Sequence, residues 1–277
     1  MGLRISTNIA AINGHRNLSK SQMVMNRSLA QLSSGSRINK AADDAAGLAI
    51  SETMRGHIRG MRQANRNAND GLSLVQTAEG GLNEIGNMII RLRELGMQAA
   101  SDTVGDRERS FINKEVMQLK DEIQRIAKTT KWGDTSLLDG STPTYEFQVG
   151  LFNNPEQDRI AFEAGKNSAT IDALGIAGID FSSKDGAQTA LQQLDEAQVR
   201  VNSNRSNLGA IQNRLQSTIN NLGVAEENMS AANSRIRDTD VAAASADLAK
   251  NNVLLQAATA TLAQASQSSQ LALQLLG

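Results

Sequence analysis

Apolar residues recur every seven positions along a long stretch in the second half of the chain. Seven large apolar residues fall at this spacing, and mostly small residues follow three positions after each. The large ones are Leu194, Val201, Leu208, Leu215, Leu222, Met229 and Ile236. A seven-residue repeat with two mainly apolar positions is the seam of a coiled coil. We therefore expect one long helix across this stretch.

A second seam runs from Met54 to Leu92, where apolar residues follow one another in steps of three and four. The mean step is about 3.5 residues, which predicts helices that wind around each other with a left-handed supercoil. Each helix would cover roughly 45–50 residues, or about 70 Å at the α-helical rise. Their matched lengths predict that the two helices lie side by side in a long antiparallel bundle.

A third, shorter helix is predicted from Asp106, as its N-cap, to Ile126. Residues 129–186 then break the helical pattern. Two segments that alternate like strands, TYEFQVG and RIAFEA, flank a turn with the sequence LFNNPEQD. We expect a small β-hairpin region at about residues 130–186 that caps one end of the bundle.

Both ends of the chain carry their own apolar stripes. At the C-terminus the stripe consists of Leu248, Leu255, Leu262 and Leu276. Residues 241–277 contain two charged side chains, Asp247 and Lys250, among Ala, Gln, Ser, Asn and Leu. A helix with so little charge needs partners on more than one face. We expect the two terminal helices to pair with each other and then with other copies of the chain.

A joint separates the first terminal helix from the bundle at residues 32–51, LSSGSRINKAADDAAGLAIS. Gly35 is suited to end the first helix with a positive φ, and Asp43 or Asp44 is suited to cap the next. The predicted fold is mainly α, and its three consecutive segments make up two domains. Residues 1–42 and 237–277 form a terminal coiled-coil domain, and residues 43–236 form the bundle with its β region.

Composition agrees with long helices and narrow seams. Aromatic residues make up 3% of the chain, and there are two prolines and no cysteine. The net charge of −1 gives no general attraction to nucleic acid or to a membrane surface. No run approaches 18 apolar residues, and the N-terminus lacks the apolar core of a cleaved signal peptide. We expect no nucleic-acid partner, no membrane insertion and, if the protein is exported, no cleaved signal.

No pattern in the sequence indicates catalysis. The two histidines, His15 and His57, are on different predicted segments, and the HExxH, GxSxG and GxxxxGK[ST] motifs do not occur. Without cysteine there is also no thiolate metal site. We therefore expect no catalytic residue, no cofactor and no metal.

Four arginines, Arg55, Arg59, Arg62 and Arg66, line one face of the helix that carries the second seam. Residues 1–66 contain ten Lys and Arg against three Asp and Glu, but no aromatic residue that would favour nucleic-acid binding. Two interpretations remain. The stripe is a solvated helix face, or it contacts acidic surface on a neighbouring subunit, which the net negative residues 67–184 would supply.

Several motifs in order resemble those of bacterial flagellin. They are LSSGSRINKAADDAAGLAIS, ANDGLSLVQTAEGGLNEI, RLRELGMQAAS, FQVG, NLGAIQNRL, SRIRDTDVA and LLQAATATLAQASQ. The resemblance covers the chain except roughly residues 165–186, where that family carries variable outer domains. It implies a short flagellin, a structural subunit that polymerises into the extracellular flagellar filament for motility. The alternatives are a hook–filament junction protein and a soluble coiled-coil binding module.

The resemblance also implies partners. The chain would bind itself in a helical homopolymer, an export chaperone at its C-terminal tail, the flagellar export apparatus, and the hook–filament junction and cap proteins. The segment RLRELGMQ at 91–98 is similar to a patch that contacts the neighbouring protofilament and that Toll-like receptor 5 recognises in many flagellins. The matching residues are Arg91, Leu95, Gln98 and Glu115, although Ile90 departs from the pattern. For Leu95 the alternative is ordinary helix packing.

Overall fold

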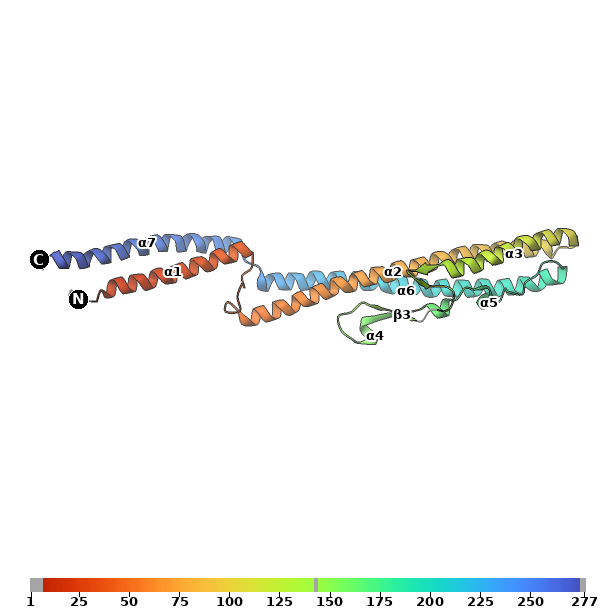
Figure 1. Ribbon diagram of the computed structural model, residues 1–277, viewed down its shortest axis with the longest axis horizontal. Helices are drawn as coiled ribbons and strands as arrows, with labels where there is room; N and C mark the ends of the chain where they lie inside the picture. The colour runs from red at the N-terminus through yellow and green to blue at the C-terminus, as the bar shows by residue number, and fades with distance from the viewer. Residues whose placement is uncertain (1–6, 142–143, 275–277) are drawn as a thin grey trace. The chain divides into compact units, whose positions relative to one another are not determined.

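The computed structural model describes residues 7–141 and 144–274. Its long helices are α1 (Ile9–Ser34), α2 (Ala45–Ala99), α3 (Asp106–Thr129), α6 (Lys184–Arg237) and α7 (Val241–Gln274). The shorter elements are β1 (Lys131–Trp132), β2 (Thr135–Ser136), β3 (Thr144–Gln148), α4 (Pro155–Asp158), β4 (Arg159–Glu163), the 3-10 turn η1 (Ala164–Asn167) and α5 (Ile171–Leu174). This mainly α fold, with paired terminal helices and small hairpins, confirms the predicted class (Figure 1).

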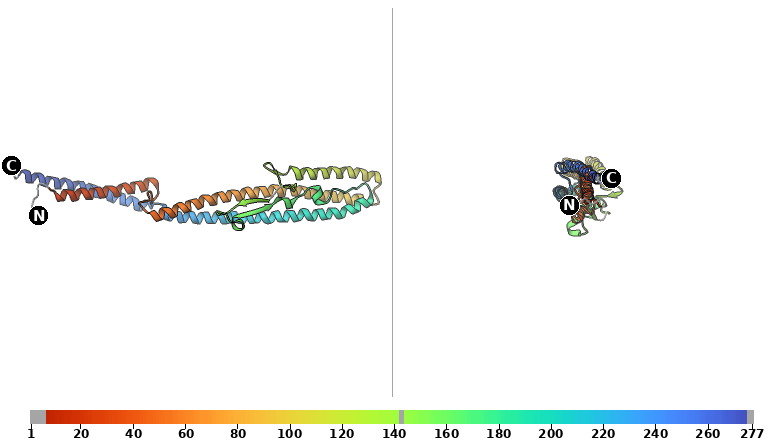
Figure 2. Two further views of the ribbon diagram at one scale, coloured as in Figure 1. Left: turned by 60° about the horizontal axis from the view of Figure 1, so that its bottom comes forward. Right: turned by 90° about the vertical axis from the view of Figure 1, so that its left-hand side faces the viewer.

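The chain forms two compact units, residues 57–227 and the terminal residues up to 56 together with those from 228 on. In the first unit, α2 and α6 run antiparallel along most of their length (Figure 2). Arg62 pairs with Glu226 near one end of the unit, and Arg93 pairs with Asp195 toward the other. Most residues of the two predicted seams are buried between the helices, with Val75, Leu82, Leu194 and Leu208 fully inaccessible. The predicted side-by-side packing of the two long helices is therefore confirmed.

Helix α3 returns along α2 and adds Ile112, Val116 and Ile123 to the same core. The predicted N-cap was wrong by one residue: Gly105 holds the cap position without a side-chain bond, and Asp106 is the first helical residue. The Asp106 carboxylate instead accepts a hydrogen bond from Arg109. Buried Arg109 also donates to the carbonyls of Ala99 and Ser101. One guanidinium thereby satisfies the backbone at the turn between the two helices.

The strands β3 and β4 pair antiparallel from Thr144 opposite Glu163 to Gln148 opposite Arg159, as predicted. The turn between them contains the short helix α4. Contrary to expectation, this region does not cap an end of the bundle but lies along the side of α2. Phe147 packs on Gly71, Leu151 packs on Gly60, and Asn67 donates to the Gln148 carbonyl at 3.0 Å. The physical reason is that glycines on α2 leave space for these large side chains.

The segment between η1 and α6 is attached to α3 by polar side chains on one helix face. The amide oxygens of Asn113 and Gln124 accept from the backbone N–H groups of Phe181 and Ile171. Between them, the buried ammonium of Lys120 donates to the Ala177 carbonyl at 2.6 Å. These bonds satisfy backbone groups that have no partner strand or helix.

In the terminal unit, α1 and α7 lie antiparallel (Figures 1 and 2). The Asn8 side chain caps α1 through the Ala11 N–H and donates to the Ala265 carbonyl at 2.8 Å. Further along the pair, Leu262 lies against Gly14. The predicted pairing of the terminal helices within one chain is thus observed.

The joint after α1 has the predicted chemistry. Gly35 ends the helix with φ of 68°, a conformation that glycine adopts without steric cost. Asp44 caps α2, because its carboxylate accepts from the Gly47 N–H at 2.8 Å. Asp43 has a different role: it accepts from the N–H groups of Lys40 and Asn39 and pairs with Arg27. The backbone bond from Lys40 is the main reason why the pKa of Asp43 lies below its usual value.

Backbone hydrogen bonds tie this joint to the end of α6. Arg37 N donates to the Arg237 carbonyl at 2.7 Å, and Thr239 N donates to the Gly35 carbonyl at 3.0 Å. The Arg37 guanidinium adds two bonds to the Ile236 carbonyl. The segment after α1 and the segment after α6 are therefore joined by a short antiparallel β-bridge, and not only by side-chain packing.

We predict that Gly71→Ala destabilises the protein relative to Gly80→Ala. A Cβ at position 71 would lie 2.9 Å from the Phe147 ring, whereas a Cβ at position 80 meets open space. Both changes gain the same helix propensity, about 1 kcal/mol. The difference in unfolding free energy, measured by urea denaturation, therefore reports the clash, and we expect it to be about 1–3 kcal/mol. Equal stabilities would show that the hairpin is not held against this glycine.

Candidate functional site

The pair of terminal helices exposes an unusual number of large apolar side chains. On α1 these are Ile9, Ile12, Met23, Val24 and Leu29, and on α7 they are Val241, Val253 and Leu254. Met23 is 67% exposed and Val253 is 65% exposed. Between the two helices, Val24 and Leu254 also line an open hollow of about 470 Å³. Exposed apolar side chains in such number on one helix pair are typical of a contact with another protein chain.

The leucines predicted on α7 lie on a different face. Leu248, Leu255 and Leu262 are half-buried, and Leu262 packs against α1. Leu276 lies outside the described residues. Sequence periodicity therefore found the side of α7 that faces α1, and it missed the exposed side with Val253 and Leu254. The lack of charge in residues 241–277 had indicated partners on more than one face, but it did not single out these two residues.

A second surface surrounds Arg91, where α2 and α3 lie side by side. The Arg91 guanidinium donates two hydrogen bonds to Glu115 on α3 and one to Glu94 one turn along α2. The bonds to Glu115, followed by those to Glu94, raise the pKa of Arg91 above its usual value. All three side chains are about half exposed, so another molecule can reach their charges.

The other residues predicted for this surface divide into exposed and buried ones. Gln98 is exposed, but Leu95 is 3% exposed and packs in the core, in line with the alternative of ordinary helix packing. Exposed apolar side chains from both helices accompany the charges: Ile90 and Met97 on α2, and Phe111 on α3. Sequence reasoning missed Met97 and Phe111, and it noted Ile90 only as a departure from the flagellin pattern. These apolar residues fall outside the three- and four-residue steps of the seam, and an apolar residue outside the seam is the signal that could have found them.

The four arginines of the predicted stripe are exposed, but most have partners within the chain. In the terminal unit Arg55 pairs with Glu52. In the other unit Arg62 pairs with Glu226, and Arg66 bonds to the Gln63 side-chain oxygen. Within the described part of the chain, Arg59 alone of the four makes no polar side-chain contact. The stripe therefore carries less uncompensated charge than its sequence suggests.

The described residues offer little for chemistry on small molecules. No group of three or more His, Asp or Glu side chains among them could hold a metal ion. His57 lies edge-on to the Phe152 ring at 6.0 Å between centroids. No helix in the described ranges is long and apolar enough to cross a membrane. What the described geometry presents is a set of surfaces suited to contacts between protein chains.

Comparison with known proteins identifies the family. Residues 5–142 match the bacterial flagellin N-terminal helical region, and residues 191–276 match the C-terminal helical region. The chain is 43% identical over 272 residues to a flagellin of Halalkalibacterium halodurans, which covers 98% of this chain and 99% of that protein. It is 41% identical over 308 residues to a flagellin of Bacillus subtilis, with 99% and 100% covered.

Solved structures agree. The crystal structure of Bacillus cereus flagellin matches with a TM-score of 0.51 and 30% identity, covering 61% of this chain and 94% of that one. A putative flagellar hook-associated protein of Vibrio parahaemolyticus matches with a TM-score of 0.58 but 12% identity, which shows a shared fold alone. The chain therefore belongs to the bacterial flagellins, as a short form without a large variable domain: it is a structural protein, not an enzyme, and polymerises into the extracellular flagellar filament.

Proposed function

We propose that the terminal helices, residues 1–42 and 237–277, form an inner coiled-coil layer of the filament, and that residues 43–236 form the next layer. The observation that carries this proposal is the apolar surface left exposed on α1 and α7. Burying a Val or Leu side chain contributes about 1.5–3 kcal/mol. Several such side chains on each copy give a large gain when copies pack on one another.

The subunit contacts in this proposal are of two kinds. Apolar contacts are made by the terminal pair, including the partly exposed Leu248, Leu255 and Leu262. Polar contacts are made in the bundle layer by Arg91, Gln98 and Glu115, supported by the apolar neighbours of these residues. Arg59 is the member of the arginine stripe best suited to an acidic partner, because it has no polar side-chain contact in the described residues. The solvated-face interpretation remains the alternative for the rest of the stripe.

The resemblance to flagellins supports further partners. These are an export chaperone at the C-terminal tail, the export apparatus, and the junction and cap proteins at the two ends of the filament. Toll-like receptor 5 is proposed to bind the monomer at Arg91, Gln98 and Glu115. Buried Leu95 would act there by supporting the helix pair.

We expect Leu254→Gln to weaken assembly without weakening the bundle. Leu254 is 45% exposed on α7, so in the monomer its side chain contributes little to folding. A loss of about 1.4 kcal/mol per subunit interface would raise the critical concentration for polymerisation about tenfold. Sedimentation of seeded filaments measures this concentration, and Asn252→Gln, at a neighbouring exposed polar position, is the control. A critical concentration equal to that of the control would contradict the inner-layer proposal.

Arg91→Ala is expected to separate folding from assembly. Half-exposed ion pairs contribute about 0.2–1 kcal/mol, so the melting temperature should fall only slightly. Because the same interaction between subunits would be missing at every position of the polymer, the critical concentration should still rise several-fold, and receptor signalling by the monomer should weaken. Arg125→Ala is the matched control, because Arg125 also forms an exposed pair one turn away on its helix. If the two variants polymerise and signal alike, the Arg91 surface has no special role.

The chaperone proposal predicts that residues 241–277 are necessary for binding. An apolar, weakly charged helix is an aggregation hazard before assembly, which is the physical reason to cover it. Pull-down of full-length and tail-deleted protein with the purified chaperone tests this. Equal capture of both proteins would place the chaperone site elsewhere.

A further inference from the structure

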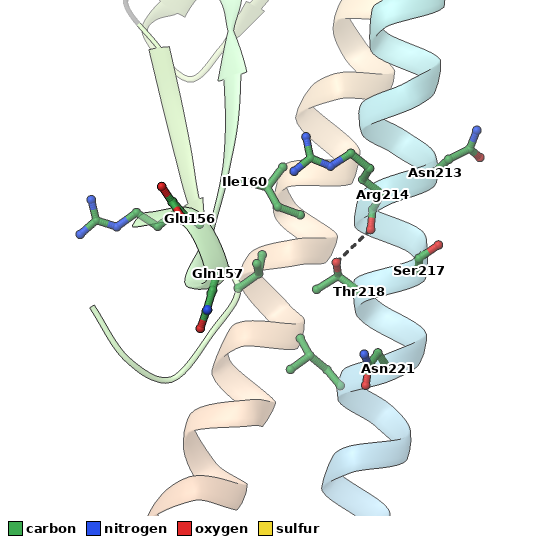
Figure 3. Close-up of a pocket in the computed structure, with 11 residues that line it drawn as sticks. Glu156, Gln157, Ile160, Asn213, Arg214, Ser217, Thr218 and Asn221 are labelled. Atoms are coloured by element: carbon green, nitrogen blue, oxygen red, sulfur yellow. Dashed lines mark hydrogen bonds between the residues drawn. The ribbon is translucent and has the colours of Figure 1, made fainter. Parts of the chain in front are cut away.

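An open groove follows α6 between residues 207 and 222. Its opposite wall is β4 with the turn before it and η1 after it. Two hollows make up the groove, of about 570 and 430 Å³, and Arg214 lines both. At the α-helical rise this stretch of α6 is about 22 Å long. Figure 3 shows the larger hollow, with Arg214 reaching from α6 toward the hairpin.

The groove exists because the third helix stops. Thr130, just after α3, packs on Gly81 of α2, close to where Glu79 bonds across the seam to Gln212 of α6. Beyond this level the hairpin replaces α3, but two strands cover α6 less completely than a helix does. Leu215 remains fully buried, whereas the seam residues Thr218 and Leu222 become half-buried. The heptad pattern of α6 thus continues past the last helix that this chain packs beside the pair.

Two charged side chains that line the groove form no ion pair in the described residues: Arg214 on α6, and Glu156 on the opposite wall of the larger hollow. Arg159 bonds to Glu146, and Lys166 pairs with Glu163. The Arg214 guanidinium has no polar partner among the described residues; the Thr218 hydroxyl donates to the Arg214 backbone carbonyl, at 2.9 Å, and not to the side chain. A carboxylate brought to this position would gain a charge-assisted hydrogen bond without displacing another one.

The chain itself contains a stretch with the opposite charge. Residues 67–90 of α2 include Asp70, Glu79 and Glu84 but no Lys or Arg. Glu79 is occupied by Gln212 and Arg205 across the seam. Asp70 and Glu84 are exposed and have no polar side-chain partner in the described part of the chain. They are two heptads apart, about 21 Å along the helix, which matches the length of the groove.

We propose that the groove around Arg214 receives the exposed face of residues 67–90 from a second copy of the chain, with Asp70 or Glu84 opposite Arg214. The proposal rests on the self-assembly that the family implies. It does not depend on which layer the terminal helices form. The contact would complete the part of the α6 seam that the hairpin covers incompletely.

A single introduced thiol tests whether the groove is occupied, because the chain has no cysteine. Ser217→Cys places the thiol in the groove, and Gln216→Cys places one on the same helix outside it. Maleimide labelling of the groove thiol should be at least tenfold slower in filaments than in monomers, and the slowing at the control thiol should be smaller. Filaments in which the groove thiol reacts as fast as in monomers, or in which both thiols slow equally, would overturn the proposal. Neither result would affect the role of α1 and α7.

Charge exchange tests which segment fills the groove. Arg214→Glu should raise the critical concentration about tenfold and leave the melting temperature unchanged, whereas Arg107→Glu, at an exposed site on α3, should change neither. Adding Asp70→Arg or Glu84→Arg to Arg214→Glu should restore assembly to within about threefold of the wild type. Restoration by one of the two second changes, beyond the sum of the single effects, supports direct contact. If neither restores assembly, residues 67–90 are not the occupant.

Discussion

The seam between α2 and α6 is the contact on which the unit of residues 57–227 depends. It holds two long helices in a fixed register, shown by the pairing of Arg62 with Glu226 and of Arg93 with Asp195. Everything else in this unit packs onto the pair. Helix α3 covers one stretch of it, the β3–β4 hairpin covers another, and the polar row on α3 holds the segment that leads into α6. Two helices alone cannot fully cover the apolar seam between them. How deeply a stretch of the seam is buried therefore depends on whether α3 or the hairpin packs over it.

In the terminal unit, part of the apolar surface stays exposed within the single chain. There α1 and α7 have only each other, and a pair of helices cannot cover apolar residues on more than one face of each. The result is a fold whose ends are paired by Asn8 and Leu262 but still expose Ile9, Met23 and Val253. An exposed apolar surface of this kind is costly for a monomeric protein, and under the inner-layer proposal neighbouring subunits bury it. That proposal gives the exposed terminal helices and the self-assembly of the chain one physical explanation.

Polar contacts fix the path of the chain at the turns between helices. Asp43 and Asp44 accept backbone N–H groups at the joint after α1, and the backbone bonds from Arg37 to Arg237 and from Thr239 to Gly35 connect the joint to the end of α6. Arg109 and Lys120 do the same for the turn after α2 and for the segment after η1. Such bonds add little net stability, but a buried backbone group without a partner would be costly, so they select one path for the chain.

The sequence by itself determined the helices, because heptad spacing is a local property that can be counted. It also determined the hairpin strands, the glycine that ends α1 and the identity of the family, whose motifs are continuous in the chain. Only the tertiary structure decided where the hairpin lies, since Phe147 and Leu151 find glycines on α2 that are far away in sequence. It also decided that Leu95 is buried, that Val253 and Leu254 are exposed, and that Arg62 is paired while Arg214 is not. Periodicity places a residue on a helix face, but whether that face meets a neighbour depends on contacts between segments distant in sequence.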